Sequence, residues 1–464
     1  MFKPLPATTI ALIVVCLGSF IGPLGMASVN IAIPDLAADL HANARLVGWL
    51  PTIFLLSNVA FMLPFGKLAD NYGRKRIYTY GLLLNALSSL MCAWADVIEW
   101  VLFWRFVQGA ASAMIFGTGV AILSSVTPAD KRGFALGLAA TCVYVGLTVA
   151  PAIGGWLTEL WGWRAVFLFQ VPLVCLLILV IKLGLKGEWK SARHSKFDWR
   201  GTSIFAISTS ALVFGLSLLP SVLGFGLLAV AIATMVLFVF HQSRHSEPLI
   251  RVQMFRESRV FSMSLSTSFL MYASVYPLSF LLSLYLQYVK GFSPAHAGQI
   301  ILLQAFSMAI VAPFAGKFSD RVQPRKIASA GCAIVALGFI ILSQIGINTS
   351  ATYIGASLLL IGLGFGLFST PNNNAIMGAV NSRELGVASA SMNLSRTIGN
   401  LVGMSVVNLL VHLYLGDARL TEQQYPALLN TISLSLYISV GCVVLASFFS
   451  AFRGRETKSN QPQQ

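Results

Sequence analysis

The sequence predicts an all-α membrane protein with fourteen transmembrane helices. Hydrophobic residues make up 56% of the 464 residues and charged residues only 10%, whereas about 25% of the residues in a soluble domain are charged. Apolar stretches of about 20 residues recur along the whole chain, and each is long enough to cross a hydrocarbon core about 30 Å thick. Because backbone groups in lipid must form hydrogen bonds within their own segment, such stretches are expected to be helices.

Short polar connections separate the expected spans. In chain order the spans cover residues 8–33, 47–66, 77–95, 99–125, 133–157, 163–185, 201–219, 222–241, 260–288, 296–315, 327–346, 351–378, 386–414 and 427–452. The first is too long for the apolar core of a signal peptide and lacks a cleavage pattern, so we expect it to remain as a span. The six cysteines all fall inside apolar segments without a metal-binding spacing, and are expected to pack as small hydrophobic residues.

Basic residues gather in alternate connections, and this asymmetry predicts the orientation of the chain. Counted from a cytoplasmic N-terminus, the connections after even-numbered spans carry Lys67, Arg74, Lys75, Arg76, Lys131, Arg132, Lys186, Lys190, Arg193, Lys196, Arg200, Arg244, Arg251, Arg256, Arg259, Lys317, Arg321, Arg325, Lys326, Arg383, Arg453 and Arg455. The opposite side has little beyond Arg45, Arg164, Lys290 and Arg419. Both termini are therefore expected in the cytoplasm, with the protein in the plasma membrane (the inner membrane of a bacterium). The net charge of +15 then reflects orientation, and no nucleic-acid partner is expected.

Two similar basic loops indicate an internal repeat. Residues 66–76 follow the second span and residues 316–326 follow the tenth. If each loop follows the second helix of a six-helix bundle, two extra spans are inserted between the bundles. The predicted division is an N-terminal bundle over 1–185, linkers with two extra spans over 186–258, a C-terminal bundle over 259–452 and a disordered cytoplasmic tail over 453–464. In transporters built from such repeats the substrate cavity lies between the repeats near mid-membrane.

The first loop resembles the cytoplasmic loop motif of the major facilitator superfamily, in which Gly, Asp, Gly and a basic run recur at this spacing. Gly66 would let the end of span two pack closely on a neighbour, and Gly73 would permit a tight turn. Asp70 can accept hydrogen bonds at a helix N-terminus and pair with a basic residue, which would latch the cytoplasmic side shut. Arg74 of the basic run is a further gating candidate. In the second copy, which has Gln-Pro in place of the glycine, the gating candidates are Asp320 and Arg325. A solvated positive-inside loop is the alternative.

Span four carries a second pattern of the same superfamily. Residues 105–109 include Arg105 and Gln108, and the resemblance implies that this arginine orders the cavity or takes part in proton coupling. A buried arginine in a membrane by default marks function. An arginine held by backbone carbonyls for structural reasons is the alternative.

Span five and the ninth span resemble the exporters of this superfamily. Residues 146–155 match the antiporter motif, in which Gly146, Gly154 and Gly155 would allow close helix approach and Pro151 would kink the helix at a contact that rearranges. Ordinary small-residue packing is the alternative. Further along, the stretch beginning at Tyr285 and Gln287 resembles the fourteen-helix drug:proton antiporter branch, and these two residues are candidate cavity residues.

Span one departs from that branch. The branch usually carries an aspartate ahead of a Val-Asn-x-Ala-x-Pro pattern; here Asn30 and Pro34 of the pattern are present, but Gly25 occupies the acidic position. Gln170 likewise replaces a customary asparagine. All sixteen acidic residues fall in loops or at span ends, so the simplest site for a cation or a coupling proton is missing. We keep Gly25 and Asn30 as cavity candidates and expect atypical coupling.

Polar residues also gather on spans twelve and thirteen. Asn372 and Asn373 belong to three consecutive asparagines that point different ways around a helix, so one or two are expected to face the cavity. Asn393 and Arg396 lie one helical turn apart and share a polar stripe with Asn400. Hydrogen bonding between helices is the alternative role for such a stripe.

These features predict a secondary active transporter that moves a small organic solute by alternating access, most simply an exporter of the multidrug-efflux type with atypical coupling. A carrier, in either direction, for a neutral or anionic metabolite or lipid is the alternative. A receptor would need a signalling domain for which the short loops leave no room, and an intramembrane enzyme would need a nucleophile or metal constellation, which we do not find. We therefore expect no enzymatic activity, no cofactor and no metal site. The expected partners are a small-molecule substrate, the lipid bilayer and a coupling proton, and the chain is expected to act as a monomer.

Overall fold

The computed structural model describes residues 7–127, 132–185, 187–188, 198–245, 248–319, 322–380, 385–416 and 422–454. All regular structure within these residues is helical. The long helices are α1 (Ala7–Asp39), α2 (Ala44–Tyr72), α3 (Arg74–Ala93), α4 (Ile98–Val126), α5 (Arg132–Trp161), α7 (Gln170–Gly184), α8 (Trp199–Ser217), α9 (Val222–Arg244), α11 (Arg259–Leu284), α12 (Pro294–Ser319), α13 (Pro324–Leu342), α14 (Ala351–Gly378), α15 (Leu385–Tyr414) and α16 (Tyr425–Phe452). Short elements are α6 (Arg164–Leu168), α10 (Gln253–Glu257), the π-helix η1 (Tyr285–Val289) and the 3-10 helix η2 (Glu422–Gln424).

Helix boundaries follow from polar caps and from one glycine. The side chain of Asn43 accepts a hydrogen bond from the amide of Leu46 (2.9 Å) at the start of α2, and Ser350 accepts from the amide of Tyr353 (3.2 Å) at the start of α14. Each cap satisfies an amide that has no partner within its helix. Gly73 separates α2 from α3 with φ of 121°, a backbone conformation that favours glycine. The turn predicted at Gly73 is therefore present.

Twelve helices among the described residues are long and apolar enough to cross a membrane. A helix also lies at each of the fourteen predicted ranges, but α3 and α8 are not among the twelve. The reason is composition: α3 begins with three consecutive basic residues, and α8 is rich in serine and threonine. The sixth predicted range is divided at Phe169 into α6 and α7, and the ninth ends in the π-helix η1.

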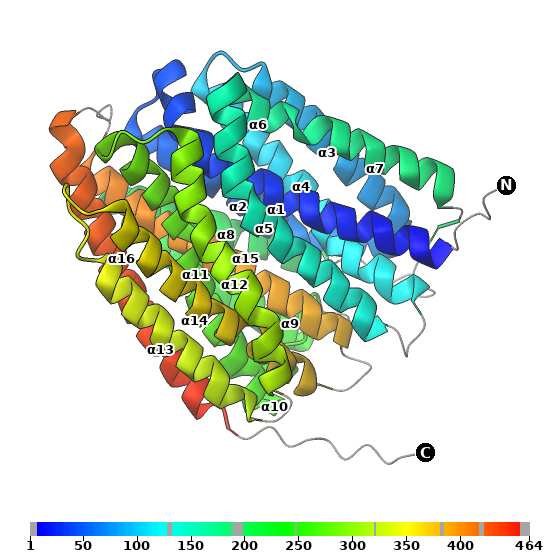
Figure 1. The fold of residues 1–464 in the computed structure, drawn as a ribbon. Helices are drawn as coiled ribbons and strands as arrows, with labels where there is room; N and C mark the ends of the chain where they lie inside the picture. The colour runs from blue at the N-terminus through cyan, green and yellow to red at the C-terminus, as the bar shows by residue number, and fades with distance from the viewer. Residues whose placement is uncertain are drawn as a thin grey trace.

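The long helices form two bundles with the same packing scheme. In the first, α1 packs on α5 while α2 and α3 pack on α4; in the second, α11 packs on α15 while α12 and α13 pack on α14. Figure 1 shows the first bundle in blue to teal and the second in green to red beside it. Between the bundles, α5 packs on α12 and α2 packs on α15. The two halves are thus arranged as an internal repeat.

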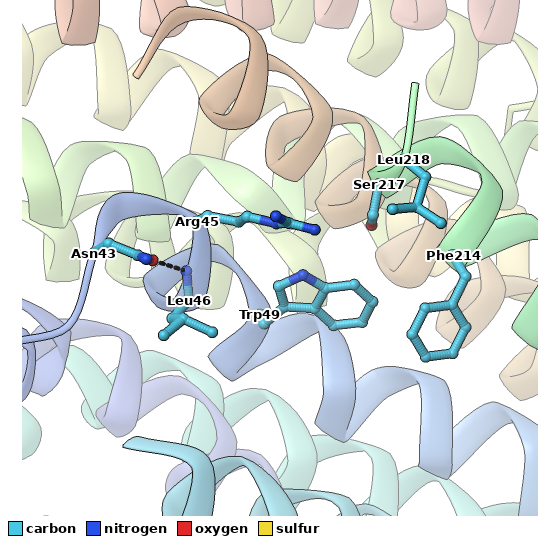
Figure 2. A pocket seen from close by; sticks show the side chains of 7 residues that line it. All are labelled: Asn43, Arg45, Leu46, Trp49, Phe214, Ser217 and Leu218. Atoms are coloured by element: carbon cyan, nitrogen blue, oxygen red, sulfur yellow. Dashed lines mark hydrogen bonds between the residues drawn. The ribbon is translucent and has the colours of Figure 1, made fainter. Parts of the chain in front are cut away.

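The inserted helices α8 and α9 pack on each other, and α8 packs on both α2 and α15 at the seam between the bundles. The rings of Trp49 on α2 and Phe214 on α8 lie 5.2 Å apart between centroids, and the side-chain amide of Asn408 on α15 donates to the hydroxyl of Ser217 on α8 (3.5 Å). A mostly apolar groove of about 330 Å³ remains between α2 and α8 (Figure 2). It is lined by Asn43, Arg45, Leu46, Trp49, Phe214, Ser217 and Leu218. None of these residues belongs to the second bundle, so the groove is not a cavity between the bundles.

The end of α16 differs from the prediction. The sequence placed Arg453 at the start of a disordered tail, yet its side chain is fully buried. Its Nη1 donates to Oδ1 of Asn372 (2.9 Å) and to the hydroxyl of Ser264 (3.2 Å). The arginine joins α16 to α14 and α11 because buried charge requires hydrogen-bond partners. Residues 455–464 lie outside the described part of the chain.

Candidate functional site

The two bundles are joined by hydrogen bonds at one end, where α1, α5 and η1 end and where α2 and α12 begin; we call this the closed end. The side-chain amide of Gln287 donates to the carbonyl of Ile31 (2.9 Å), and the hydroxyl of Tyr288 donates to the carbonyl of Pro34 (3.3 Å). The carboxylate of Glu159 on α5 accepts from the amide of Ala295 in the first turn of α12 (3.1 Å). A carboxylate at a helix N-terminus is favoured by the helix dipole.

Small residues bring backbones into contact at the closed end. A Cβ atom at Gly155 would lie 2.3 Å from the carbonyl oxygen of Pro294 on α12. A Cβ atom at Gly298 on α12 would lie 2.2 Å from the carbonyl oxygen of Pro151 on α5. Only hydrogen fits at both positions, so α5 and α12 approach each other as closely as backbones allow.

The other glycines of the span-five motif face α1 within the first bundle. A Cβ at Gly146 would lie 2.5 Å from the carbonyl oxygen of Phe20, and one at Gly154 would lie 2.6 Å from that of Ser28. The motif therefore has two packed faces, one toward α1 and one toward the opposite bundle. The close approaches expected from its small residues are present; their part in a conformational change stays a prediction.

The basic loop between α2 and α3 contacts its own bundle. Arg74 pairs with Asp70 (2.7 Å) and donates to the carbonyl of Ala121 on α4 (3.0 Å) and to the hydroxyl of Ser125. The bonds found for Asp70 go to this arginine, and not to the helix N-terminus that the sequence suggested. Gly66 lies beside Gly117 of α4, but its own Cβ would meet nothing within 4 Å, so close packing does not require a glycine there.

The structure describes only part of the second copy of the loop, residues 316–319 and 322–326. Nε of Arg325 donates to the side-chain oxygen of Gln323 (3.0 Å) at an exposed position. Asp320 lies outside the described residues, so the gating role expected for it stays a prediction.

Arg105 lies at the centre of a buried network in the first bundle. Its side chain is 1% exposed; Nη1 donates to Oε1 of Gln108 (2.6 Å), and Gln108 donates to the hydroxyl of Ser89 on α3 (2.8 Å). Nε reaches the carbonyl of Leu50 on α2 (3.4 Å), and the guanidinium lies 4.5 Å from the ring centroid of Phe54. Arg105 and Gln108 thus hold α2, α3 and α4 together without a carboxylate among these contacts.

The network extends toward the second bundle through α11. The side-chain amide of Asn30 on α1 donates to the hydroxyl of Ser279 (3.1 Å). Tyr276, one helical turn earlier on α11, lies within electrostatic range of Arg105 and close to Asn30. Tyr276 and Ser279 were not among the sequence candidates, because a serine or tyrosine in an apolar span is common. Their position at the bundle interface becomes visible only in the fold.

Gly25 contacts Gln170 directly. A Cβ at Gly25 would lie 2.0 Å from Oε1 and 2.4 Å from Cδ of Gln170. The glutamine is buried and its Nε2 donates to the carbonyl of Val166 (3.2 Å). A neutral amide therefore fills the space beside position 25.

The three asparagines of α14 point in different directions, as expected. Asn372 donates to the carbonyl of Ser264 (3.1 Å) and to the hydroxyl of Ser268 (2.9 Å) on α11, and it accepts from Arg453. It therefore joins helices inside the second bundle. Asn373 accepts from Nη2 of Arg396 (2.6 Å), whereas Asn374 is exposed.

Arg396 is a half-buried cation of the second bundle. Besides its bond to Asn373, its guanidinium lies 5.3 Å from the ring centroid of Tyr272 on α11. Asn393 lies one turn away on α15 and is also half-buried. Tyr285, by contrast, is fully buried and donates to the carbonyl of Gly346 (2.7 Å). It attaches η1 to the α13–α14 connection within the same bundle.

The described acidic residues of the long helices all lie near helix ends, at Asp35, Asp39, Asp70, Glu99 and Glu159. In the middle of these helices the charged side chains of the described residues are Arg105 and Arg396. The fold and this distribution define a polytopic membrane protein with two helical bundles, joined at one end and carrying polar side chains where they meet. This is the architecture of a transporter.

The chain belongs to the Major Facilitator Superfamily, whose sequence profile matches residues 15–404. It is 28% identical to the riboflavin transporter RibZ of Clostridioides difficile over 85% of this chain and 86% of that protein. It is 30% identical to the multidrug resistance protein Stp of Mycobacterium tuberculosis over 86% of this chain and 75% of that protein. A solved bacterial homologue of the human lysosomal transporter Spinster shares the fold, with a TM-score of 0.71 and 16% identity over 97% of this chain and 98% of that chain. The protein is an integral membrane transporter and not an enzyme.

Proposed function

We propose that this transporter is a secondary active exporter of small neutral or anionic organic solutes, working by alternating access with atypical coupling. The observation that carries the proposal is the filling of the space beside Gly25 by the neutral amide of Gln170. The charged groups in the middle of the described spans are cationic. Because the Coulomb energy between like charges grows as the dielectric constant falls, a cationic solute would be repelled there.

Export of several compounds is the first candidate because relatives of this chain are called multidrug resistance or multidrug transporter proteins. A carrier for one neutral or anionic metabolite is the second candidate. It is favoured by the similarity to a riboflavin transporter and by the half-buried guanidinium of Arg396, a planar cation whose geometry matches carboxylates and phosphates.

The proposal includes a topology of fourteen spans with both termini in the cytoplasm, and a monomer as the working unit. On this topology α3 and α8 also cross the membrane, because each connects two spans whose orientations require it. The closed end then faces the outside. Within the described helices, Glu159 and Asp35 are the acidic residues beside contacts between the bundles, which makes them the candidates for proton coupling.

Flux measurements in proteoliposomes test the solute class. The purified protein would be assayed with an ethidium-like cation, a neutral dye and an anionic dye of similar size. We expect saturable transport of the neutral or anionic dye and weaker transport of the cation. Replacing Arg396 with glutamine keeps a hydrogen-bond donor but removes the charge. This variant should lower anion transport about tenfold or more and leave transport of the neutral dye unchanged. The reason is that a charge pair at 4 Å contributes about 4 kcal/mol at an effective dielectric constant of 20.

The matched control is Arg256→Gln, which removes an exposed positive charge from the short helix α10, outside the gating and cavity candidates. It should leave all three fluxes unchanged. Tight, saturable cation transport by the unmodified protein would contradict the proposed solute class, and equal loss of anion transport in both variants would contradict the role of Arg396.

A further inference from the structure

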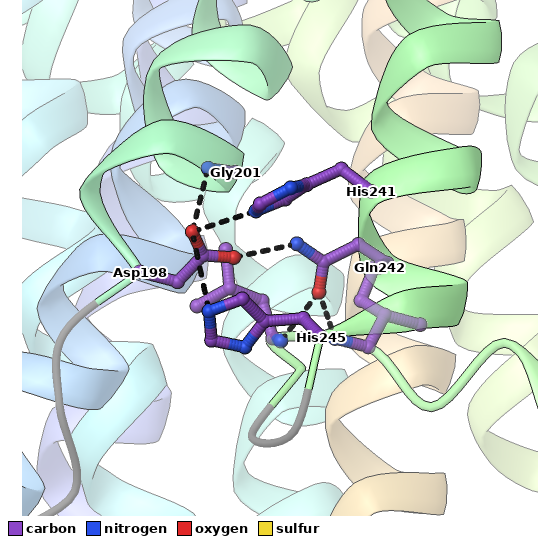
Figure 3. A network of polar contacts seen from close by, with 7 residues as sticks. Asp198, Gly201, His241, Gln242 and His245 are labelled. Carbon is purple, nitrogen blue, oxygen red and sulfur yellow. Dashed lines mark hydrogen bonds and ion pairs between the residues drawn. The ribbon is translucent and has the colours of Figure 1, made fainter.

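A cluster of one aspartate and two histidines lies where the inserted helix pair begins and ends (Figure 3). Asp198 precedes α8, and its Oδ1 accepts from the amide of Gly201 (2.8 Å). Nε2 of His241 lies 2.9 Å and Nε2 of His245 lies 4.0 Å from the same Oδ1. The three ligand atoms all lie within 4.8 Å of one another.

These distances suit a small divalent cation. Zinc binds imidazole nitrogen and carboxylate oxygen at about 2.0–2.2 Å, so ligand atoms around a tetrahedral ion stand roughly 3.3 Å apart. The observed separations from Oδ1, 2.9 Å and 4.0 Å, fall on either side of that value. Both separations from Oδ1 differ from that value by less than 1 Å.

The backbone holds the two histidines on one face. His241 and His245 are separated by four positions, and side chains at this spacing meet on the same side of a helix. The amide of His245 donates to the carbonyl of His241 (3.0 Å), so the helical turn continues to the second ligand. The spacing is visible in the sequence, but Asp198 is distant along the chain and reaches the pair only because α8 and α9 are antiparallel neighbours.

A second layer of contacts orients the carboxylate. The buried side chain of Gln242 donates to Oδ2 of Asp198 (2.8 Å) and accepts from the amide of Leu249 (2.6 Å). Metal ligands are typically oriented by such partners, and losing one costs about 10–100-fold in affinity. The aspartate side chain is 2% exposed, but those of His241 and His245 are 24% and 26% exposed, so an ion here can be reached from water.

We propose that Asp198, His241 and His245 bind a divalent transition-metal ion of the zinc type, with the remaining coordination position open to water. Two imidazoles and one carboxylate suit zinc, copper or nickel ions, whereas magnesium and calcium prefer oxygen ligands. The bound ion joins the start of α8 to the end of α9. It also stabilises the connection toward α10, because Gln242 contacts both the carboxylate and Leu249.

Zinc titration of the full-length protein tests the site. The protein would be purified in detergent, freed of any histidine tag, stripped with a chelator and titrated with ZnCl₂ by calorimetry. We expect one equivalent to bind, with MgCl₂ in excess unable to compete. His245→Gln should weaken binding at least about 100-fold, and Gln242→Ala should weaken it about 10–100-fold.

Asp198→Asn keeps an oxygen acceptor for the amide of Gly201 while removing the negative charge, and should also abolish tight binding. The matched control is His296→Gln, which changes an exposed histidine of α12 and should bind zinc as the unmodified protein does. Thermal unfolding without metal shows that each variant is folded, and zinc should raise the midpoint of the unmodified and His296→Gln proteins but not of His245→Gln. Absence of stoichiometric zinc binding, or equal binding by the unmodified protein and His245→Gln, would overturn the proposal.

Discussion

Gly25 and Gln170 fit one another as a pair. The glutamine amide lies where a side chain on residue 25 would begin, and it is held there by its bond to Val166. An acidic residue at position 25 could not be accommodated unless this amide moved. The neutral character of the site is therefore a property of two residues on different helices.

At the residue scale we predict that cation transport requires both positions to change. Gly25→Asp alone must displace Gln170 and break its hydrogen bond, which contributes about 1 kcal/mol. Gly25→Asp combined with Gln170→Ala opens the space and places a carboxylate there. We expect transport of an ethidium-like cation to rise about tenfold or more in the double variant, because a carboxylate 4 Å from a cation contributes about 4 kcal/mol at an effective dielectric constant of 20.

The control for this prediction is Gln170→Ala without the aspartate, which makes the same space without a charge. Cation flux in proteoliposomes should stay at the unmodified level in that control. Equal cation flux in the single, double and control variants would show that position 25 does not face the solute path.

The sequence identified Gly25 and Gln170 separately as departures from a pattern, but not their contact. Which residues of two helices touch depends on the rotation of each helix about its axis. Spans that are apolar on every side give little indication of that rotation. The same limit applied to Arg74: the sequence suggested a basic partner for Asp70, but not the bonds of Arg74 to Ala121 and Ser125 of α4.

At the element scale, helix α5 is the principal contact of the first bundle with the second. Its small residues were expected to allow close packing, and both faces are in contact in the structure. Hydropathy predicted the positions of the long helices well because the bilayer imposes their length. Hydropathy underestimated the lengths of the helices. Helix α1 extends to Asp39 and α2 to Tyr72, beyond the apolar stretches at 8–33 and 47–66. Helices continue into the polar connections until a cap or a glycine ends them.

We predict that Gly155→Ala destabilises the closed end. The new Cβ would lie 2.3 Å from a backbone oxygen of the opposite bundle, and backbone atoms cannot rotate away as a side chain can. Overpacking of this kind costs about 1–3 kcal/mol, which changes the ratio of two conformations about 5- to 150-fold. Spin labels at Asp96 and Ile347, exposed positions on the two bundles at this end, should report a larger population at longer distance.

Gly226→Ala is the matched control, because a Cβ on that glycine of α9 would meet nothing within 4 Å. Its distance distribution should match that of the unmodified protein. An unchanged distribution in Gly155→Ala would mean that α5 and α12 can separate slightly without opening the closed end.

At the scale of the whole molecule, the repeat and the inserted pair explain the arrangement. The two loops recognised in the sequence belong to equivalent positions of bundles that pack alike. Helix α8 lies at the seam between the bundles, and α9 packs on α8. Sequence reasoning found the repeat because the loops are similar in composition. It did not find the cluster of Asp198 with His241 and His245, because a three-residue site assembled from two helices leaves only a histidine pair as a local signal.

The final prediction concerns the orientation of this assembly in the membrane. A membrane-impermeant maleimide added to intact cells should label a cysteine introduced at Asp96 and not one introduced at Arg76. The side chain of Asp96 in the α3–α4 connection is 94% exposed and that of Arg76 at the start of α3 is 64% exposed, so both are chemically reachable and only their side of the membrane differs. The basic residues around Arg76 predict a cytoplasmic location, because connections rich in lysine and arginine stay inside.

After cells are permeabilised both cysteines should react, and the parent protein, whose six native cysteines lie in helices, supplies the background. Labelling of Arg76→Cys in intact cells, with Asp96→Cys protected, would reverse the topology, and the closed end would then face the cytoplasm.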